Sequence, residues 1–110
     1  MMMRRRPDTP HGELPPEIQR GDYWKVLTRD GSKPLQSEFP ENLTGTCWII
    51  AIPMTYGYAL ANLMRHTVRE HEDGEISVRP GDGSSNSILV TGHHGEQWHG
   101  YIEHGVLQQV

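Results

Sequence analysis

The order of apolar and polar residues predicts two strands in the first half of the chain. Residues 23–27 are rich in strand-forming side chains and lead into the turn sequence Arg-Asp-Gly-Ser at 29–32. Residues 47–52, Cys-Trp-Ile-Ile-Ala-Ile, form the most apolar run and end at Pro53. Because this run is short, rich in Ile and free of polar residues, it indicates a strand buried on both faces.

The segment from Thr55 to His71 favours a helix. Its apolar positions recur with the spacing of one helical face, Thr55 can cap the start, and Gly74 can end the last turn. The positions on that face are Leu60, Leu63, Met64, Thr67, Val68 and His71.

A hairpin is the alternative for the end of this segment. Residues 72–74 would form its loop, with the glycine in the left-handed region. That register places Val68 opposite Val78 and Glu70 opposite Ile76, so only one of the two pairs is apolar. Whether residues 66–71 end a helix or form a strand therefore stays open at this point.

The rest of the chain alternates as strands do. Residues 76–78, 87–91, 97–103 and 106–110 are separated by short polar turns that are mostly rich in glycine, which predicts an antiparallel meander. The expected fold class is α+β, with one helix packed on a small antiparallel β-sheet. The predicted core consists of Trp48, Ile50, Ile52, Leu60, Leu63, Met64, Val68, Ile76, Val78, Ile88, Val90, Trp98 and Ile102.

Residues 1–20 lack this periodicity. They contain four prolines, at positions 7, 10, 15 and 16, and are predicted to form an N-terminal tail that contributes little to the fold. The remaining residues, 21–110, are predicted to form a single α+β domain.

Composition and charge exclude several classes. The chain has 110 residues and one cysteine, Cys47, so neither an internal disulfide nor a Cys-x-x-Cys zinc site is possible. No apolar run is long enough for a membrane helix and no signal sequence is recognisable, so a cytoplasmic location is expected. Without Arg4, Arg5 and Arg6, the rest has seven basic and fourteen acidic residues, which makes nucleic-acid binding an unfavoured function.

Histidine supplies the candidate chemistry. Six of the seven histidines lie between His66 and His104, and neutral imidazole is a common transition-metal ligand. Alternation along the strand at 97–103 places His99 and Glu103 on one face, away from the predicted core side. With His93 and His94 from the preceding turn, these residues form the candidate site for a divalent transition metal, of a cupin-like kind.

Other candidate sites in the sequence do not match the motifs that they would need. His66 and His71 are five residues apart, whereas an inverted zinc-protease motif needs a spacing of four. The favoured explanation of the histidines is that they are ordinary half-exposed sheet residues that bind nothing. The glycine-rich segment 81–87 lacks a phosphate-loop motif, and Cys47 is expected to be a buried, inert thiol.

The C-terminal third resembles a known group of sequences. Residues 87–90 (Ser-Ile-Leu-Val) and 98–106 (Trp-His-Gly-Tyr-Ile-Glu-His-Gly-Val) are similar to the end of small uncharacterised proteins of actinobacteria and their phages. Some of those carry the label "ammonia monooxygenase", which the residues quoted do not support. Several relatives have an upstream cysteine cluster that suggests zinc; here only Cys47 stands in that region, and Trp98 replaces a cysteine, although His99 matches. The resemblance implies an origin and no activity.

The function predicted from the sequence is therefore a non-catalytic binding or interaction protein, without a cofactor, that presents a surface to a host or virion protein. The alternative is a His-dependent metal-binding protein or small metalloenzyme that uses His99 and Glu103. An enzyme is the less favoured class.

Overall fold

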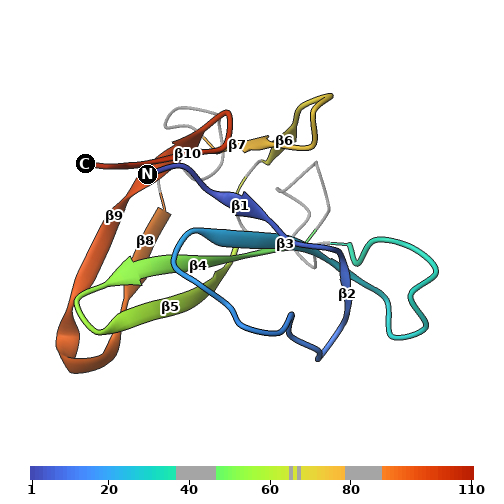
Figure 1. Ribbon diagram of the computed structural model, residues 1–110, viewed down its shortest axis with the longest axis horizontal. Helices are drawn as coiled ribbons and strands as arrows, with labels where there is room; N and C mark the ends of the chain where they lie inside the picture. The colour runs from blue at the N-terminus through green and yellow to red at the C-terminus, as the bar shows by residue number, and fades with distance from the viewer. Residues whose placement is uncertain (37–46, 65, 67, 79–87) are drawn as a thin grey trace.

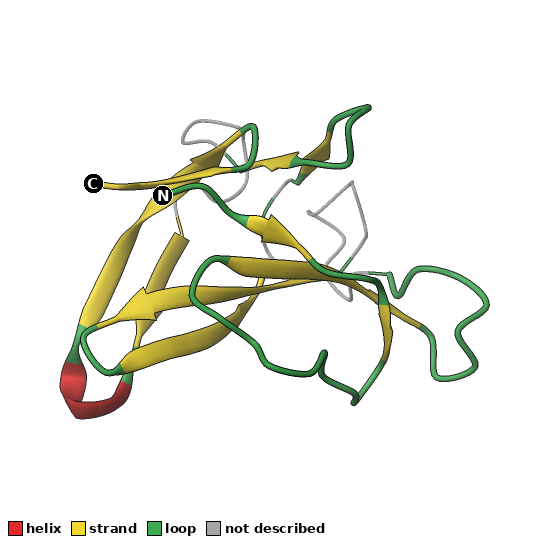
Figure 2. Cartoon of the chain, in the orientation of Figure 1, coloured by secondary structure: helices red, strands yellow, loops and turns green. Residues whose placement is uncertain are grey.

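The computed structural model describes residues 1–36, 47–64, 66, 68–78 and 88–110, whose regular structure is nearly all β (Figures 1 and 2). The expected α+β class is wrong. The described residues contain no α-helix, and their only helical element is a short 3₁₀ turn, η1 (His93–Gly95). None of them forms a helix long and apolar enough to cross a membrane.

Two larger sheets enclose the main core. The first has the strand order β1-β3-β4-β5, with β2 also beside β3, and the second has the order β10-β9-β8. Its C-terminal strands form an antiparallel meander, as the alternation predicted. The strands of the first sheet are β1 (Arg4–Arg5), β2 (Thr9–Pro10), β3 (Asp22–Leu27), β4 (Trp48–Met54) and β5 (Gly57–Asn62). Those of the second are β8 (Ile88–Thr91), β9 (Gln97–Glu103) and β10 (Val106–Gln109).

A third, two-stranded sheet consists of β6 (Arg69–Glu70) and β7 (Ile76–Ser77). Its register pairs Glu70 with Ile76, which is the hairpin alternative considered from the sequence. Val78 continues this chain onto β9 by pairing with Ile102. The small sheet is thereby attached to β9, the central strand of the second sheet, beyond the point where β8 begins.

The predicted helix is replaced by β5 and β6. β5 forms a tight hairpin with β4, in which Met54 pairs with Gly57 and Ile49 with Asn62. Exposure alternates along β5 with a period of two, so Leu60 faces outward although the helical pattern placed it in the core. Arg65 and Thr67 of the same segment lie outside the described residues.

The prediction that residues 1–20 form a tail outside the fold is also corrected. β1 and β2 both pair in parallel with β3, and Met3 is buried in the main core. Asp22, itself buried, accepts hydrogen bonds from Arg4 Nε at 2.8 Å, Arg4 Nη2 at 2.7 Å and Arg6 Nη1 at 2.9 Å. Arg4 and Arg6 therefore fasten this segment to the sheet.

The core lies between the two larger sheets. Of the predicted core residues, Leu60 is 42% exposed and Met64 and Val90 are only partly buried, whereas the others are buried as expected. The sequence did not indicate four further members of this core, namely Met3, Tyr23, Met54 and Leu107. A second, smaller cluster of Trp24, Val26 and Cys47 lies apart from it.

Candidate functional site

The outer face of the β3–β4–β5 sheet is apolar. Trp24 and Val26 of β3 belong to the second cluster, and Ile49 of β4 packs against it. On β5, Tyr58 and Leu60 point outward and are 37% and 42% exposed. An antiparallel sheet with one face in the core normally carries polar side chains on the other face. Here both faces are apolar.

A groove of about 500 Å³ is hollowed into this face, which we call the outer groove. The residues that line it come from the N-terminal segment and from β3, β4, β5 and the residues next to these strands. Its volume is in the range of ordinary ligand sites. The residues that line it are His11, Gly12, Glu13, Leu14, Trp24, Val26, Leu35, Cys47, Ile49, Leu60, Ala61, Asn62 and Met64.

Trp24 is the polar group of the outer groove that lacks a partner. Its side chain is fully buried, and its indole Nε1 has no hydrogen-bond acceptor among the described atoms. A buried donor without an acceptor costs roughly 1–3 kcal/mol.

Cys47 lies on the floor of the same groove and is an inert thiol, as expected. It is buried, and burial raises the pKa of the thiol to about 11 because the thiolate is disfavoured away from water. At neutral pH it is therefore protonated and is a poor nucleophile.

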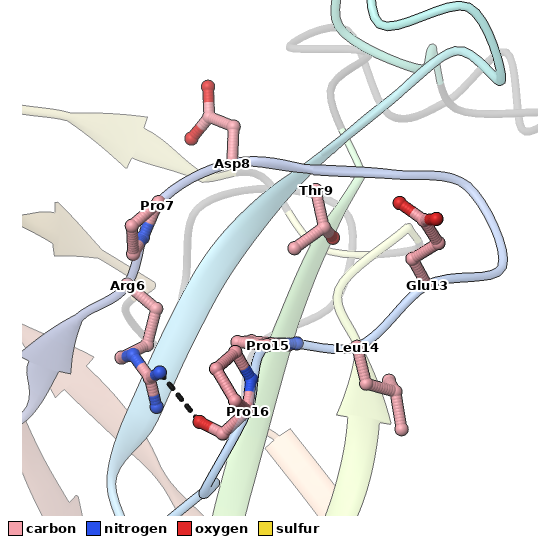
Figure 3. Close-up of a pocket in the computed structure, with 8 residues that line it drawn as sticks. All are labelled: Arg6, Pro7, Asp8, Thr9, Glu13, Leu14, Pro15 and Pro16. Carbon is pink, nitrogen blue, oxygen red and sulfur yellow. Dashed lines mark hydrogen bonds between the residues drawn. The ribbon is translucent and has the colours of Figure 1, made fainter.

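A second hollow, of about 550 Å³, lies within the N-terminal segment (Figure 3). Arg6 reaches across it and donates from Nη2 to the carbonyl oxygen of Pro16 at 2.6 Å. All of its walls come from residues 6–16, including Thr9 of β2, so the N-terminal segment shapes it without a contribution from β3, β4 or β5. Leu14 borders both this hollow and the outer groove. The outer groove is the stronger candidate site, because residues of several strands line it.

A group of polar side chains lies beside the small β6–β7 sheet, where the β6–β7 turn and the β9–β10 turn meet. It consists of Asp73, Glu75 and His104, which we call the His104 cluster, and one ligand atom from each lies within 4.8 Å of the others. His104 Nε2 is 2.7 Å from Asp73 Oδ2 and 3.7 Å from Glu75 Oε2. Among the described side chains it is the one group of three or more potential metal ligands.

Ser77 contacts the backbone of His104, and His71 contacts its ring. The backbone N–H of His104 donates to Ser77 Oγ at 2.8 Å, and His71 Nε2 lies 2.6 Å from the same oxygen. The rings of His71 and His104 stack with centroids 4.0 Å apart. The hydrogen bond to Asp73 raises the pKa of His104, and it lowers the pKa of Asp73 in return.

The site residues predicted from the sequence lie elsewhere. His99 and Glu103 are exposed on the outer face of β9, as alternation indicated. His94 is exposed in the η1 turn beside Tyr56, and the side chain of His93 is outside the described set. His94, His99 and Glu103 do not belong to any described group of three ligands.

Sequence reasoning missed the His104 cluster because His104 is 31 residues from Asp73 in the sequence. The hairpin register of Glu70 with Ile76 was the one available signal, since it fixes the turn that carries Asp73 and Glu75. That register alone does not place the turn beside β9 and β10.

Comparison with known proteins adds no relative. No protein-family model matches the chain, and neither the curated proteins nor the solved structures contain a significant match.

Proposed function

We propose that this chain is a non-catalytic binding protein and that the outer groove, together with β5, is its binding surface. The observation that carries the proposal is the apolar outer face of the β3–β4–β5 sheet, with Tyr58 and Leu60 exposed beside a hollow of about 500 Å³. Exposed apolar surface that is contiguous with a groove is typical of an interaction site.

The proposed occupant is an extended segment of a partner protein. β5 is the last strand in the order β1-β3-β4-β5, so no described strand is hydrogen-bonded to its other edge, although β8 lies near part of β5. A further strand could pair there. A segment paired there would lay alternate side chains over Tyr58 and Leu60 and into the groove. The resemblance of the C-terminal third suggests that the partner is a host or virion protein.

The chemistry of the groove disfavours a nucleic acid as its occupant. Its lining is mainly apolar, with Glu13 at one side, and the chain has a net charge of −4. Binding to a phosphate backbone depends on several Lys or Arg side chains gathered on one surface. A protein segment with apolar side chains satisfies this lining.

Binding of the apolar dye anilinonaphthalene sulfonate tests the surface. We expect saturable dye fluorescence with the folded protein, and at least tenfold weaker binding to Leu60→Glu. Leu89→Glu is the matched control, because Leu89 is also an exposed strand leucine but lies on β8 of the other sheet. Equal binding to both variants, or no saturable binding to the wild type, would contradict the proposal.

Photo-crosslinking tests the occupant. With p-benzoylphenylalanine at position 58, we expect a discrete protein adduct in extract of the native cells, absent when Leu60→Glu is combined with it. The same probe at position 89 should give no such adduct. Adducts of equal yield at both positions, or adducts that persist with Leu60→Glu, would contradict a protein partner at this groove.

A further inference from the structure

We propose that Asp73, Glu75 and His104 bind a divalent transition-metal ion, independently of the outer groove. The three side chains come from two turns that the fold brings together, the β6–β7 turn and the β9–β10 turn. They combine one imidazole nitrogen with two carboxylates, a ligand set suited to zinc, manganese, iron or nickel.

The spacing of the ligand atoms fits a single ion. Ligands about 2.0–2.2 Å from one zinc ion lie about 3–3.5 Å from each other. The distances from His104 Nε2 are 2.7 Å to Asp73 Oδ2 and 3.7 Å to Glu75 Oε2, on either side of that value. Small rotations of exposed side chains would bring all three into range, with water completing the coordination.

An ion pair alone does not account for both carboxylates. One imidazole N–H can serve one of them, and Asp73 already takes it at 2.7 Å. Glu75 is nevertheless directed at the same nitrogen, which brings a second negative charge close to the first. Two carboxylates converging on one atom repel each other, and a divalent cation would offset that repulsion. The positive charge of Arg69 also acts on His104, but it does not share these contacts.

The surroundings hold the ligands in place. Ser77 fixes the backbone of His104, and the stacked ring of His71 limits rotation of its imidazole. Gly105 makes room for the Glu75 carboxylate, because a Cβ atom at this position would lie 2.6 Å from Glu75 Cδ. The residue next to the histidine ligand is therefore one that permits the second carboxylate to approach.

The nitrogen ligand distinguishes the class of ion. Calcium and magnesium prefer sites built entirely from oxygen, whereas zinc readily combines imidazole and carboxylate. We therefore expect zinc to bind in preference to magnesium. The cluster is partly exposed, so water can occupy the remaining coordination positions.

The test is isothermal titration calorimetry of zinc chloride into the chelator-treated full chain at neutral pH, with magnesium chloride in parallel. We expect one saturable zinc site, and at least tenfold weaker binding to Asp73→Asn, Glu75→Gln and His104→Gln. Two variants serve as controls that should bind as the wild type does: Glu72→Gln on the same turn, and His99→Gln on the same strand region. Thermal unfolding of each variant without zinc confirms that it is folded.

Each remaining outcome would overturn the assignment. Loss of binding with His99→Gln and its retention with His104→Gln would place the metal at the site predicted from the sequence. The absence of saturable binding, or equal binding of zinc and magnesium, would leave only an exposed ion pair. Glu75→Gln keeps the Asp73–His104 contact. A loss of zinc affinity in this variant would therefore show that Glu75 binds the metal and has more than a structural role.

Discussion

On the second sheet, the polar residues His99 and Glu103 are exposed on the outer face of β9. The outer face of the first sheet instead carries Trp24, Ile49 and Leu60, whose apolar side chains are poorly solvated by water. Both sheets give their inner faces to the same core, so the core does not explain the difference. An apolar second face is expected only where something covers it. The N-terminal segment covers part of this face, and the part beside β5 is the surface proposed above for a partner.

The largest expected loss of stability compares a core-facing side chain just after β5 with a side chain on the outer face of β5. Leu63→Ala should lower the free energy of unfolding by about 2–5 kcal/mol, because Leu63 is fully buried in the core between the sheets. Leu60→Ala, three residues earlier but on the outer face, should cost less than about 1 kcal/mol. Urea unfolding followed by fluorescence measures both. Similar, large losses at the two positions would support the helical pattern over the sheet.

The next effect concerns the segment that covers the outer face. Asp22→Ala should cost at least about 2 kcal/mol, because it removes the buried acceptor of Arg4 and Arg6. Asp8→Ala removes only an exposed contact to Arg5 and should cost less than about 1 kcal/mol. Equal effects of the two variants on urea unfolding would show that residues 1–20 are not fastened to β3.

The same carboxylate makes stability depend on pH. Burial acts to raise the pKa of Asp22, but the hydrogen bonds from Arg4, Gln19 and Arg6 outweigh it and lower the pKa. A group with a lowered folded-state pKa stabilises the protein above its unfolded pKa, about 4, and loses that contribution as pH falls further. The free energy of unfolding of Asp22→Asn should therefore fall less than that of the wild type below that pH. Parallel curves would exclude Asp22 as the source.

The smallest expected effect lies where the two sheets meet at the surface. The carboxylate of Glu96 accepts hydrogen bonds from the backbone N–H of Thr55 at 2.9 Å and from its hydroxyl at 2.6 Å, joining the β4–β5 turn to the start of β9. Because the contact is exposed, Glu96→Gln should lower the thermal midpoint only slightly, and less so in high salt. A fall as large as that of Leu63→Ala would show that this contact holds the sheets together.

The strands that could be predicted are those whose pattern needs no distant partner. Alternation located β8, β9 and β10, and the apolar run located β4. β5 could not be located in this way, because its Ala-Leu-Ala-Asn-Leu-Met sequence has a high helix propensity and pairing with β4 overrides it. Its helical spacing was a coincidence between Leu60, which faces out, and Leu63, which faces in.

The site was less predictable than the fold. The position of His99 and Glu103 on one face of a strand followed from alternation alone. The outer groove depends on the N-terminal segment, which reaches β3 through Asp22 and shows no periodicity of its own. The His104 cluster depends on two turns meeting, which is a property of the tertiary structure.

The pairing of Met1 with Leu107 has a consequence for the order of folding. The Met1 amino group donates to the Leu107 carbonyl across 106 positions of sequence, and Leu107 N–H donates back to the Met1 carbonyl. To form contacts between residues so far apart in sequence, the chain first loses the entropy of closing a long loop. This loss slows folding into the millisecond-to-second range typical of all-β domains. During synthesis on the ribosome, Met1 and Met2 can pair with β10 only after it has emerged, whereas β1 and β2 can pair with β3 as soon as β3 is available.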